Sequence, residues 1–386
     1  MNHDYFNQKI DRSDTSTVKY DLRKVLFGTD DILPLWVADM DLPTAPEIVE
    51  ALTERIQHPI YGYTLQDNSF WQSAIDWIDK RHQWKVHRKD FVFVPGIVPA
   101  LGLLVESLTK PKEKVGIFSP VYPPFKDNII GNDRTLVDIP LINKNNHYFI
   151  NFDQFEKELI NGLKLILFCH PQNPSGRVWN KEELEKILSL CDQYDCNIIS
   201  DEIHADLMFF GNKHIPFASL SKIAEKRVVT CMAPSKTFNL AGLNCAYLLF
   251  KNNDLKEKYI QRVKHMHLDF GGLMATESMK SAYTKGESWY QALLVHLEEN
   301  INYVTQALSD TPIKVMKPQA TYLIWLDCNA LGNSQEEIKN LFYKKMKVGV
   351  QDGTMFGDAG KGFMRLNTAC SRSLLEEAIQ RIKSNL

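Results

Sequence analysis

The feature that most constrains the fold is an alternation of two residue patterns along the middle of the chain. Short apolar runs bounded by glycine or proline alternate with longer stretches in which apolar residues recur at helical spacing. Strands separated by helices are typical of a mainly parallel sheet with helices on its faces. We predict strands at residues 91–94, 114–118, 163–168, 197–200, 228–232 and 246–250.

The intervening stretches carry helix signals. Residues 181–193 place four apolar side chains on one face, and Asn180 precedes them as a helix N-cap. Residues 99–108 are predicted to form another helix. The predicted fold class is therefore α/β.

The pattern changes near residue 285. Long charged helices are predicted at residues 287–308 and 334–345, with a strand at residues 322–326 between them. We therefore expect a large domain at residues 46–284 and a smaller α+β domain at residues 285–386. Residues 1–45 lack strong periodicity and are expected to form an N-terminal arm that packs as part of the small domain.

The composition excludes several classes of protein. With 44% hydrophobic and 24% charged residues, the chain of 386 residues lacks the signature of disorder and can bury a large core. The net charge of −2 provides no basic field, so nucleic acid is not an expected partner. The chain shows neither an apolar run that could span a bilayer nor an apolar signal segment near residue 1, so we expect no membrane contact and a cytoplasmic location.

Seven cysteines are scattered along the chain without a C-x-x-C pair. We interpret them as reduced thiols that behave as small apolar residues. Metal binding is the alternative, but the spacing of metal ligands is absent. We therefore predict no metal site.

In an open α/β sheet, ligands bind beyond the carboxyl ends of the strands, so the residues after each predicted strand are candidates for a site. Residues 91–94 lead through Gly96 and Ile97 into a helix whose free N–H groups could hold a phosphate. Residues 114–118 lead into a proline-rich loop that presents Tyr122, whose ring could stack on a flat ligand. An ordinary turn glycine and a packing tyrosine are the alternatives.

The next two strand ends carry an amide and acids. Asn173 is held between two prolines, so its amide could make a directed hydrogen bond, although an ordinary Asn-Pro turn has the same sequence. Asp201 ends another strand and could pair with a cationic nitrogen, or act only as a helix cap. His204 could support this acid or be structural.

The last of these strands leads to Ser235 and Lys236. A lysine that follows an apolar strand, between small hydroxyl residues, can bond covalently to a carbonyl cofactor, although most lysines are solvated surface charges. Five strand ends thus supply phosphate-binding amides, a ring for stacking, an amide, an acid and a lysine. If each residue had only its ordinary structural role, all five would have to occur at strand ends by chance. We therefore favour a cofactor site.

The motifs around these residues resemble a known superfamily. HPQNPSGRVW, SDEIHADL and APSKTFNLAGL are similar to the fold-type I enzymes that use pyridoxal 5'-phosphate (PLP), of aspartate aminotransferase-like architecture. More narrowly, PLWVADMD, YGYT, SDEIHADL and GFMRLN resemble the MalY/PatB family of cystathionine β-lyase-like carbon–sulfur lyases. The resemblance spans nearly the whole chain.

The resemblance implies a role for each candidate in cofactor binding. Lys236 would hold PLP covalently, Asp201 would face the ring nitrogen, and Asn173 would face the phenolic oxygen. Tyr122 would stack on the ring, and His204 would lie beside it. The residues implied for the phosphate are Gly96, Ile97 and Ser235, together with Tyr61 of the other subunit of a homodimer. The implied catalytic residues are Lys236, Tyr122 and Asp201.

The resemblance also implies an amino-acid substrate. Arg365 would bind its α-carboxylate through a bidentate fork, with Asn173, Trp36 and Tyr61 nearby. One departure from the family pattern is His170-Pro171-Gln172, where relatives more often carry Asn-Pro-His before the shared asparagine. This departure keeps Asn173 itself, so it puts in doubt only the residues that surround Asn173 and adjust its properties.

The implied reaction is an α,β-elimination that cleaves cystathionine or a related S-substituted cysteine to a thiol, pyruvate and ammonia. An aminotransferase is the main alternative, because it shares every cofactor contact named above. A regulatory protein that binds a partner with the same fold is a second alternative. The group on sulfur stays open, because the depth of the pocket depends on loop packing.

Overall fold

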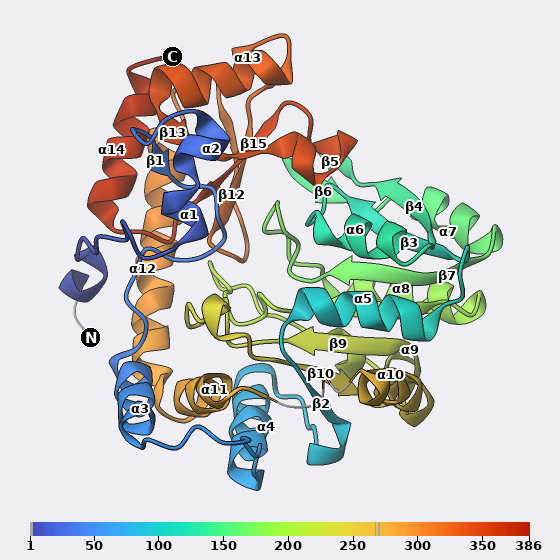
Figure 1. Cartoon of the computed structure of the whole chain (residues 1–386). Coiled ribbons are helices and arrows are strands. Elements are labelled where there is room, and N and C mark those ends of the chain that lie inside the picture. Colours follow the sequence, from blue (N-terminus) through green and yellow to red (C-terminus); the bar gives the residue numbers. More distant parts are fainter. Residues whose placement is uncertain (1–2, 267, 269–270) are drawn as a thin grey trace.

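The computed structural model describes residues 3–266, 268 and 271–386, so the first two residues of the predicted arm lie outside the described residues. Its centre is a seven-stranded sheet in the order β2-β10-β9-β8-β7-β3-β4. Helices pack against this sheet in front and behind, with α5 (Ile97–Leu108) on one side and α8 (Lys181–Gln193) on the other (Figure 1). The strands are β2 (Phe91–Val94), β3 (Lys114–Ser119), β4 (Thr135–Pro140), β7 (Leu163–Cys169), β8 (Asn197–Asp201), β9 (Val228–Met232) and β10 (Ala246–Phe250).

Side chains of the sheet alternate between two apolar cores. In β7, Leu165 and Leu167 join the core beneath α5, whereas Ile166 and Phe168 join the larger core that includes the buried face of α8. This alternation follows from the two-residue period of a strand. It explains why the strands are apolar at nearly every position, since both faces of the sheet are covered.

All six predicted strands are present, and the sheet is mainly parallel, as predicted, with one antiparallel strand. Strand β10 runs antiparallel to both β9 and β2. A parallel return needs a crossover, usually a helix, and residues 233–245 between β9 and β10 contain only a short 3₁₀ turn at Ala241–Leu243. The prediction also missed the edge strand β4, in which only Val137 and Ile139 are buried.

Helix α8 begins with the polar cap that the sequence predicts. Asn180 accepts a hydrogen bond from the backbone N–H of Glu183 (2.8 Å), and the Glu183 carboxylate accepts one from the N–H of Asn180 (2.9 Å). Helix α5 begins two residues before the predicted start, because Pro99 is tolerated in the first helical turn. The helices are α3 (Pro46–Gln57), α4 (Asn68–His82), α5 (Ile97–Leu108), α6 (Pro124–Gly131), α7 (Phe152–Ile160), α8 (Lys181–Gln193), α9 (Lys222–Arg227), α10 (Asn253–His265) and α11 (Leu273–Lys285).

The C-terminal part contains a four-stranded antiparallel sheet in the order β11-β12-β15-β14. The predicted helix at residues 334–345 is divided into α13 and a turn of π-helix at Leu341–Met346. The elements are α12 (Glu287–Ala307), β11 (Lys314–Met316), β12 (Leu323–Asp327), α13 (Gln335–Asn340), β14 (Gln351–Asp352), β15 (Phe363–Asn367) and α14 (Arg372–Lys383). The domain boundary at residue 285 stays a prediction, because α12 runs from the layer of α3 and α11 up to this sheet (Figure 1).

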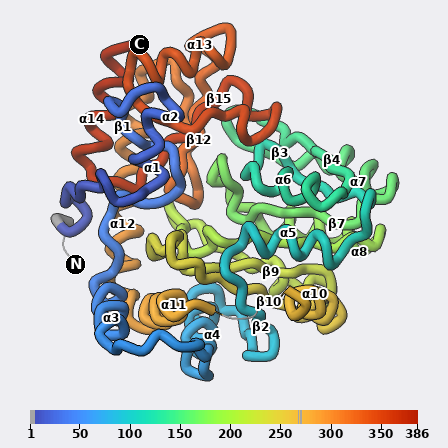
Figure 2. Tube along the Cα trace, in the orientation of Figure 1, coloured from blue at the N-terminus to red at the C-terminus, as the bar shows by residue number. Residues whose placement is uncertain are grey.

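The N-terminal segment packs on the C-terminal elements, as Figure 2 shows in blue and red. Strand β1 (Leu33–Pro34) pairs in parallel with β13 (Val348–Gly349). The arm also contains the short helices α1 (Val18–Asp21) and α2 (Arg23–Phe27). Across the described residues, we find no helix with both the length and the apolar character needed to span a bilayer.

Candidate active site

A cavity of about 460 Å³ lies at the carboxyl ends of the central strands, where the C-terminal sheet and the N-terminal arm meet them. The predicted site residues that line it are Trp36, Gly96, Ile97, Tyr122, Asn173, Asp201, His204, Ser235, Lys236 and Arg365. They come from segments that are up to about 330 residues apart in the chain. The fold therefore brings together all but one of the predicted site residues.

Lys236 lies in the turn after β9. Its Nζ donates a hydrogen bond to the carbonyl of Ala38 (2.6 Å). Burial and, next, the neighbouring Arg365 lower the pKa of Lys236 to about 8, although Asp39 and Asp201 act in the opposite direction. With this pKa, about one tenth of Lys236 is a neutral amine at pH 7, far more than for an exposed lysine, and the neutral form is the one that a nucleophile or a base requires.

Asp201 is the last residue of β8. One carboxylate oxygen accepts a hydrogen bond from the backbone N–H of Ile203 (3.2 Å). Burial raises the pKa of Asp201 to about 7, which the nearby Lys236 only partly offsets. A cationic ring nitrogen held against this carboxylate would favour its charged form and would itself stay protonated.

The start of α5 is suited to bind an anion. Gly96 precedes the helix in extended conformation, and no side chain caps the helix N-terminus. The first N–H groups of a helix have no partner within it, so those of Ile97 and Val98 are available to a phosphate, which the helix dipole also favours. Ser235 lines the same cavity.

Arg365 projects from β15 in the C-terminal sheet. One guanidinium nitrogen donates to the Asn173 side-chain oxygen (2.9 Å) and another to the carbonyl of Trp36 (3.0 Å). The Nε atom is buried without a hydrogen-bond partner, and no acidic side chain among the described residues forms an ion pair with this guanidinium. Burial lowers the pKa of Arg365 to about 10. A buried cation without a protein anion is suited to bind a ligand carboxylate.

His204 and Tyr122 complete the wall around these charges. The Nδ1 atom of His204 is buried without a hydrogen-bond partner. Burial holds the pKa of His204 well below its usual value, and the cations Lys236 and Arg365 lower it further, so the imidazole is neutral. Burial also raises the pKa of Tyr122, which keeps the phenol protonated.

These residues fit PLP. The helix start suits the phosphate, Tyr122 provides an aromatic ring in the wall of the cavity, and Asp201 suits the ring nitrogen. Lys236 is an amine of lowered pKa within the same cavity. The donor set therefore contains each kind of group that this cofactor requires.

Tyr61 is the one predicted site residue that does not line this cavity. Its side chain is 60% exposed, and its hydroxyl donates to the carbonyl of Ile56 (2.6 Å). It lies in a separate hollow beside Gly271 and Leu273. Within one chain the structure does not bring Tyr61 to the site, so its predicted role in a partner subunit stays a prediction.

Asp206 supports the site and is not among the residues predicted from the sequence. Its buried carboxylate accepts hydrogen bonds from Thr237, next to Lys236 (2.9 Å), and from the indole of Trp77 (3.1 Å). His82 lies 3.1 Å from the other oxygen. The position of Asp206 within the SDEIHADL motif was the only signal, since its partners come from distant elements.

The departure at residues 170–172 is accommodated outside the cavity. The Gln172 amide donates to the carbonyl of Pro120, and its oxygen accepts from the backbone N–H of Ser175 (3.0 Å). His170 lies 2.9 Å from the carbonyl of Ile215 and packs against the ring of His214. Neither His170 nor Gln172 lines the site.

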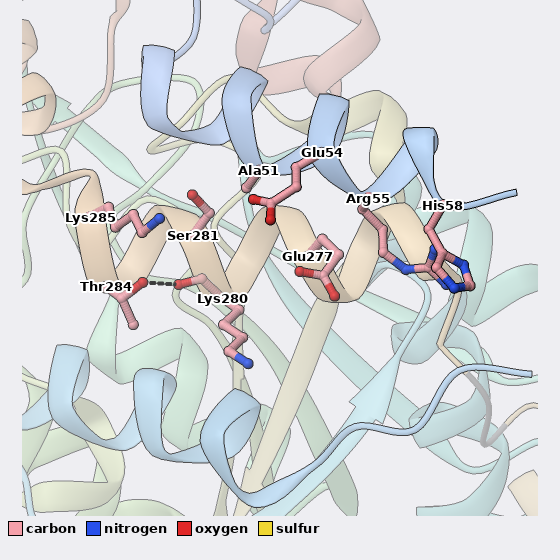
Figure 3. A pocket seen from close by; sticks show the side chains of 9 residues that line it. All are labelled: Ala51, Glu54, Arg55, His58, Glu277, Lys280, Ser281, Thr284 and Lys285. Carbon is pink, nitrogen blue, oxygen red and sulfur yellow. Dashed lines mark hydrogen bonds between the residues drawn. The ribbon is translucent and has the colours of Figure 1, made fainter. Parts of the chain in front are cut away.

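Other features of the described residues offer no comparable site. A second cavity lies between α3 and α11 and is lined by Glu54, Arg55, Glu277, Lys280 and other polar side chains, as Figure 3 shows. None of the predicted site residues lies there. All seven cysteines are buried and free, and the described residues hold no group of three or more histidine, cysteine or acidic side chains placed for a metal ion.

Comparison with known proteins places this geometry in a family. The family model for aminotransferase class I and II matches residues 30–382. Cystathionine beta-lyase PatB of Bacillus subtilis (strain 168) is 41% identical over 384 residues, which is 99% of each chain. Protein MalY of Escherichia coli (strain K12) is 32% identical over 379 residues, covering 97% of this chain and 96% of MalY.

A solved structure shows the same arrangement over the full length. The PLP-bound C-S lyase from Staphylococcus hominis matches with a TM-score of 0.91 and 32% identity, covering 99% of this chain and 97% of that one. The matches run from the arm to the last helix, so they include every strand end that lines the cavity. This chain belongs to the aminotransferase class I and II family.

Proposed function

We propose that this chain is a PLP-dependent carbon–sulfur lyase that cleaves cystathionine or a related S-substituted cysteine to a thiol, pyruvate and ammonia. The observation that carries the proposal is the pairing of Lys236 with Arg365 in one cavity: an amine of lowered pKa beside a buried guanidinium without a protein anion. The first can act on Cα of an amino acid and the second binds its carboxylate. The names of the full-length relatives supply the choice of sulfur chemistry.

The chain's own residues perform the positioning and the proton transfer. Arg365 orients the α-carboxylate with the help of Asn173, which fixes the guanidinium plane. Lys236, as a neutral amine, removes the proton from Cα. When bound, PLP supplies the electron sink that makes this proton acidic, and Asp201 maintains the charge on its ring nitrogen. The Cβ–S bond then breaks, and water converts the remaining fragment to pyruvate and ammonia.

The direct test is to incubate the PLP-loaded protein with cystathionine and measure pyruvate and free thiol. We expect both products in equal amounts. A parallel incubation with an amino acid and α-ketoglutarate measures amino-group transfer. Transfer that proceeds while pyruvate and thiol stay at background would show that the chain is an aminotransferase instead.

We also propose that the protein works as a homodimer with Tyr61 reaching the site of the other subunit. A run of large apolar side chains on the connection from α3 to α4 supports this proposal, since Ile60, Tyr61, Tyr63 and Leu65 are all at least 60% exposed. An apolar surface of this kind is typical of an interface. The cytoplasmic location and the absence of nucleic-acid partners stay predictions from the sequence.

A further inference from the structure

Lys19 of α1 has no exposed surface, which is rare for a lysine. Its Nζ lies 2.6 Å from Asp41 Oδ2 and 3.3 Å from Asp39 Oδ1. Arg12 binds the other oxygens of the same two carboxylates, at 2.5 Å from Asp41 and 2.7 Å from Asp39. Two cations of the N-terminal arm thus hold two anions of one short segment, residues 36–41.

The same lysine also holds the start of that segment through its backbone. The indole Nε1 of Trp36 donates to the carbonyl of Lys19 (3.0 Å). The preceding residue, Val18, lines the active-site cavity together with Trp36. Lys19 therefore connects to both ends of residues 36–41, by its carbonyl at Trp36 and by its ammonium at Asp39 and Asp41.

Residues 36–41 in turn contact both groups that act on the substrate. The carbonyl of Trp36 accepts from Arg365 (3.0 Å), and the carbonyl of Ala38 accepts from Lys236 (2.6 Å). Asn367, also on β15, donates to the carbonyls of Val37 and Asp39 (2.6 Å each). A displacement of this segment would therefore move the acceptors that aim Arg365 and Lys236.

We infer that Lys19 is a positioning residue for substrate binding: its buried ammonium and its carbonyl fix residues 36–41 as the wall of the cavity formed by the N-terminal arm. The inference rests on the proposed function only in taking the cavity as an amino-acid site. Lys19 lines no part of the cavity itself and acts through Trp36 and through the carboxylates of Asp39 and Asp41.

Lys19→Met tests the inference, because methionine keeps most of the side-chain volume and removes the charge. Lys24→Met on the adjacent helix α2 is the matched control, since Lys24 is exposed. The KM for an S-substituted cysteine should rise about tenfold in Lys19→Met and kcat should fall by a smaller factor, because the displaced segment moves the acceptor of Arg365, which binds the carboxylate, and also that of Lys236. The control should match the parent in both constants.

A second measurement does not depend on turnover. The chain contains seven tryptophans, so the emission of Trp36 is obtained as the difference between each protein and its Trp36→Phe version. We expect acrylamide to quench this difference signal at least about twofold more strongly in Lys19→Met, since the indole loses its fixed position. Lys24→Met should leave it unchanged.

The outcomes separate this inference from the proposed function. If the parent protein releases no thiol, the proposed function fails, and the quenching of Trp36 still decides the role of Lys19. If Lys19→Met has the KM and the quenching of the parent, the inference is wrong. Should Lys19→Met fail to fold by circular dichroism, Asp41→Asn, which keeps the shape and removes the ion pairs of Asp41 with Lys19 and Arg12, must shift both readouts in the same direction.

Discussion

Lys236 shares its cavity with a second cation, and this neighbour explains part of its lowered pKa. Burial is the largest cause and Arg365 the next. We predict that, in the protein freed of PLP, the rate of acetylation of Lys236 rises with a midpoint near pH 8, whereas exposed lysines titrate at about 10.4. Competitive labelling over a pH series with peptide mapping measures this midpoint.

The sign of the Arg365 effect gives a control for that titration. Because a positive neighbour disfavours the protonated amine, Arg365→Gln should move the Lys236 midpoint to higher pH. A midpoint near 10 in the parent protein, or no upward shift in Arg365→Gln, would contradict this account of the site.

Arg365 itself depends on the shape of its guanidinium and not only on its charge. The fork contacts Asn173 and Trp36 at once, leaving Nε for the ligand. Lysine is a point charge and cannot make this pattern. We predict that Arg365→Lys raises KM for the amino-acid substrate by about one hundredfold. This corresponds to a loss of about 2.7 kcal/mol in the free energy of binding. Steady-state kinetics measure it, and a KM within threefold of the parent would exclude a bidentate clamp.

At the scale of elements, the loop after β7 is fixed by close packing at a glycine. Gly176 has a φ of +69°, and a Cβ there would lie 2.6 Å from the carbonyl oxygen of Ala320 and closer still to Pro318. The two segments are held together at this point, because the carbonyl of Gly176 accepts hydrogen bonds from the backbone N–H groups of Gln319 (2.9 Å) and Ala320 (3.0 Å). The contact joins the loop that carries Asn173 to the C-terminal sheet.

We therefore predict that Gly176→Ala destabilises the protein by about 2–4 kcal/mol, from backbone strain together with steric overlap. Gly211 is a matched control, because its φ is +75° and a Cβ there would meet nothing within 4 Å. Gly211→Ala should cost only about 1 kcal/mol. Urea denaturation compares the two, and equal losses would show that the packing against Pro318 and Ala320 is unimportant.

The elements also show what a sequence can and cannot predict. Strand positions such as those of β7 and β8 follow from local apolar runs and were predicted within a residue of their ends. The direction of β10 depends on how residues 233–245 fold, which no local pattern encodes. The residues at the strand ends were singled out because their chemistry is unusual, and the structure places them around one cavity. Asp206 and Lys19 were not, because only their distant partners distinguish them from ordinary charges.

At the scale of the whole molecule, the active site is made where three parts of the chain meet. The central sheet provides Asp201 and Lys236, the C-terminal sheet provides Arg365, and the arm provides Trp36. The hydrogen bonds from Arg365 to Asn173 and Trp36 link all three parts. Substrate binding at Arg365 is therefore expected to be sensitive to the relative positions of these parts, which Lys19 and Gly176 help to fix.

The dimer proposal is tested by combining two defects in one assembly. Tyr61→Phe and Lys236→Ala dimers should each be nearly inactive, because each defect is present at both sites. A mixed dimer contains one subunit of each variant. If Tyr61 serves the site of the other subunit, one of its two sites carries both defects and the other site carries none. Random exchange of subunits at equal concentration makes half of the dimers mixed, so about a quarter of the parental activity should return.

Thiol release after mild denaturation and joint refolding measures this recovery, and tagged subunits confirm that exchange has occurred. Separately refolded samples mixed afterwards give the baseline. If Tyr61 served the site of its own chain, every site in a mixed dimer would carry one defect, and activity would stay at that baseline. The exposed position of Tyr61, outside the cavity that holds Lys236, argues for recovery.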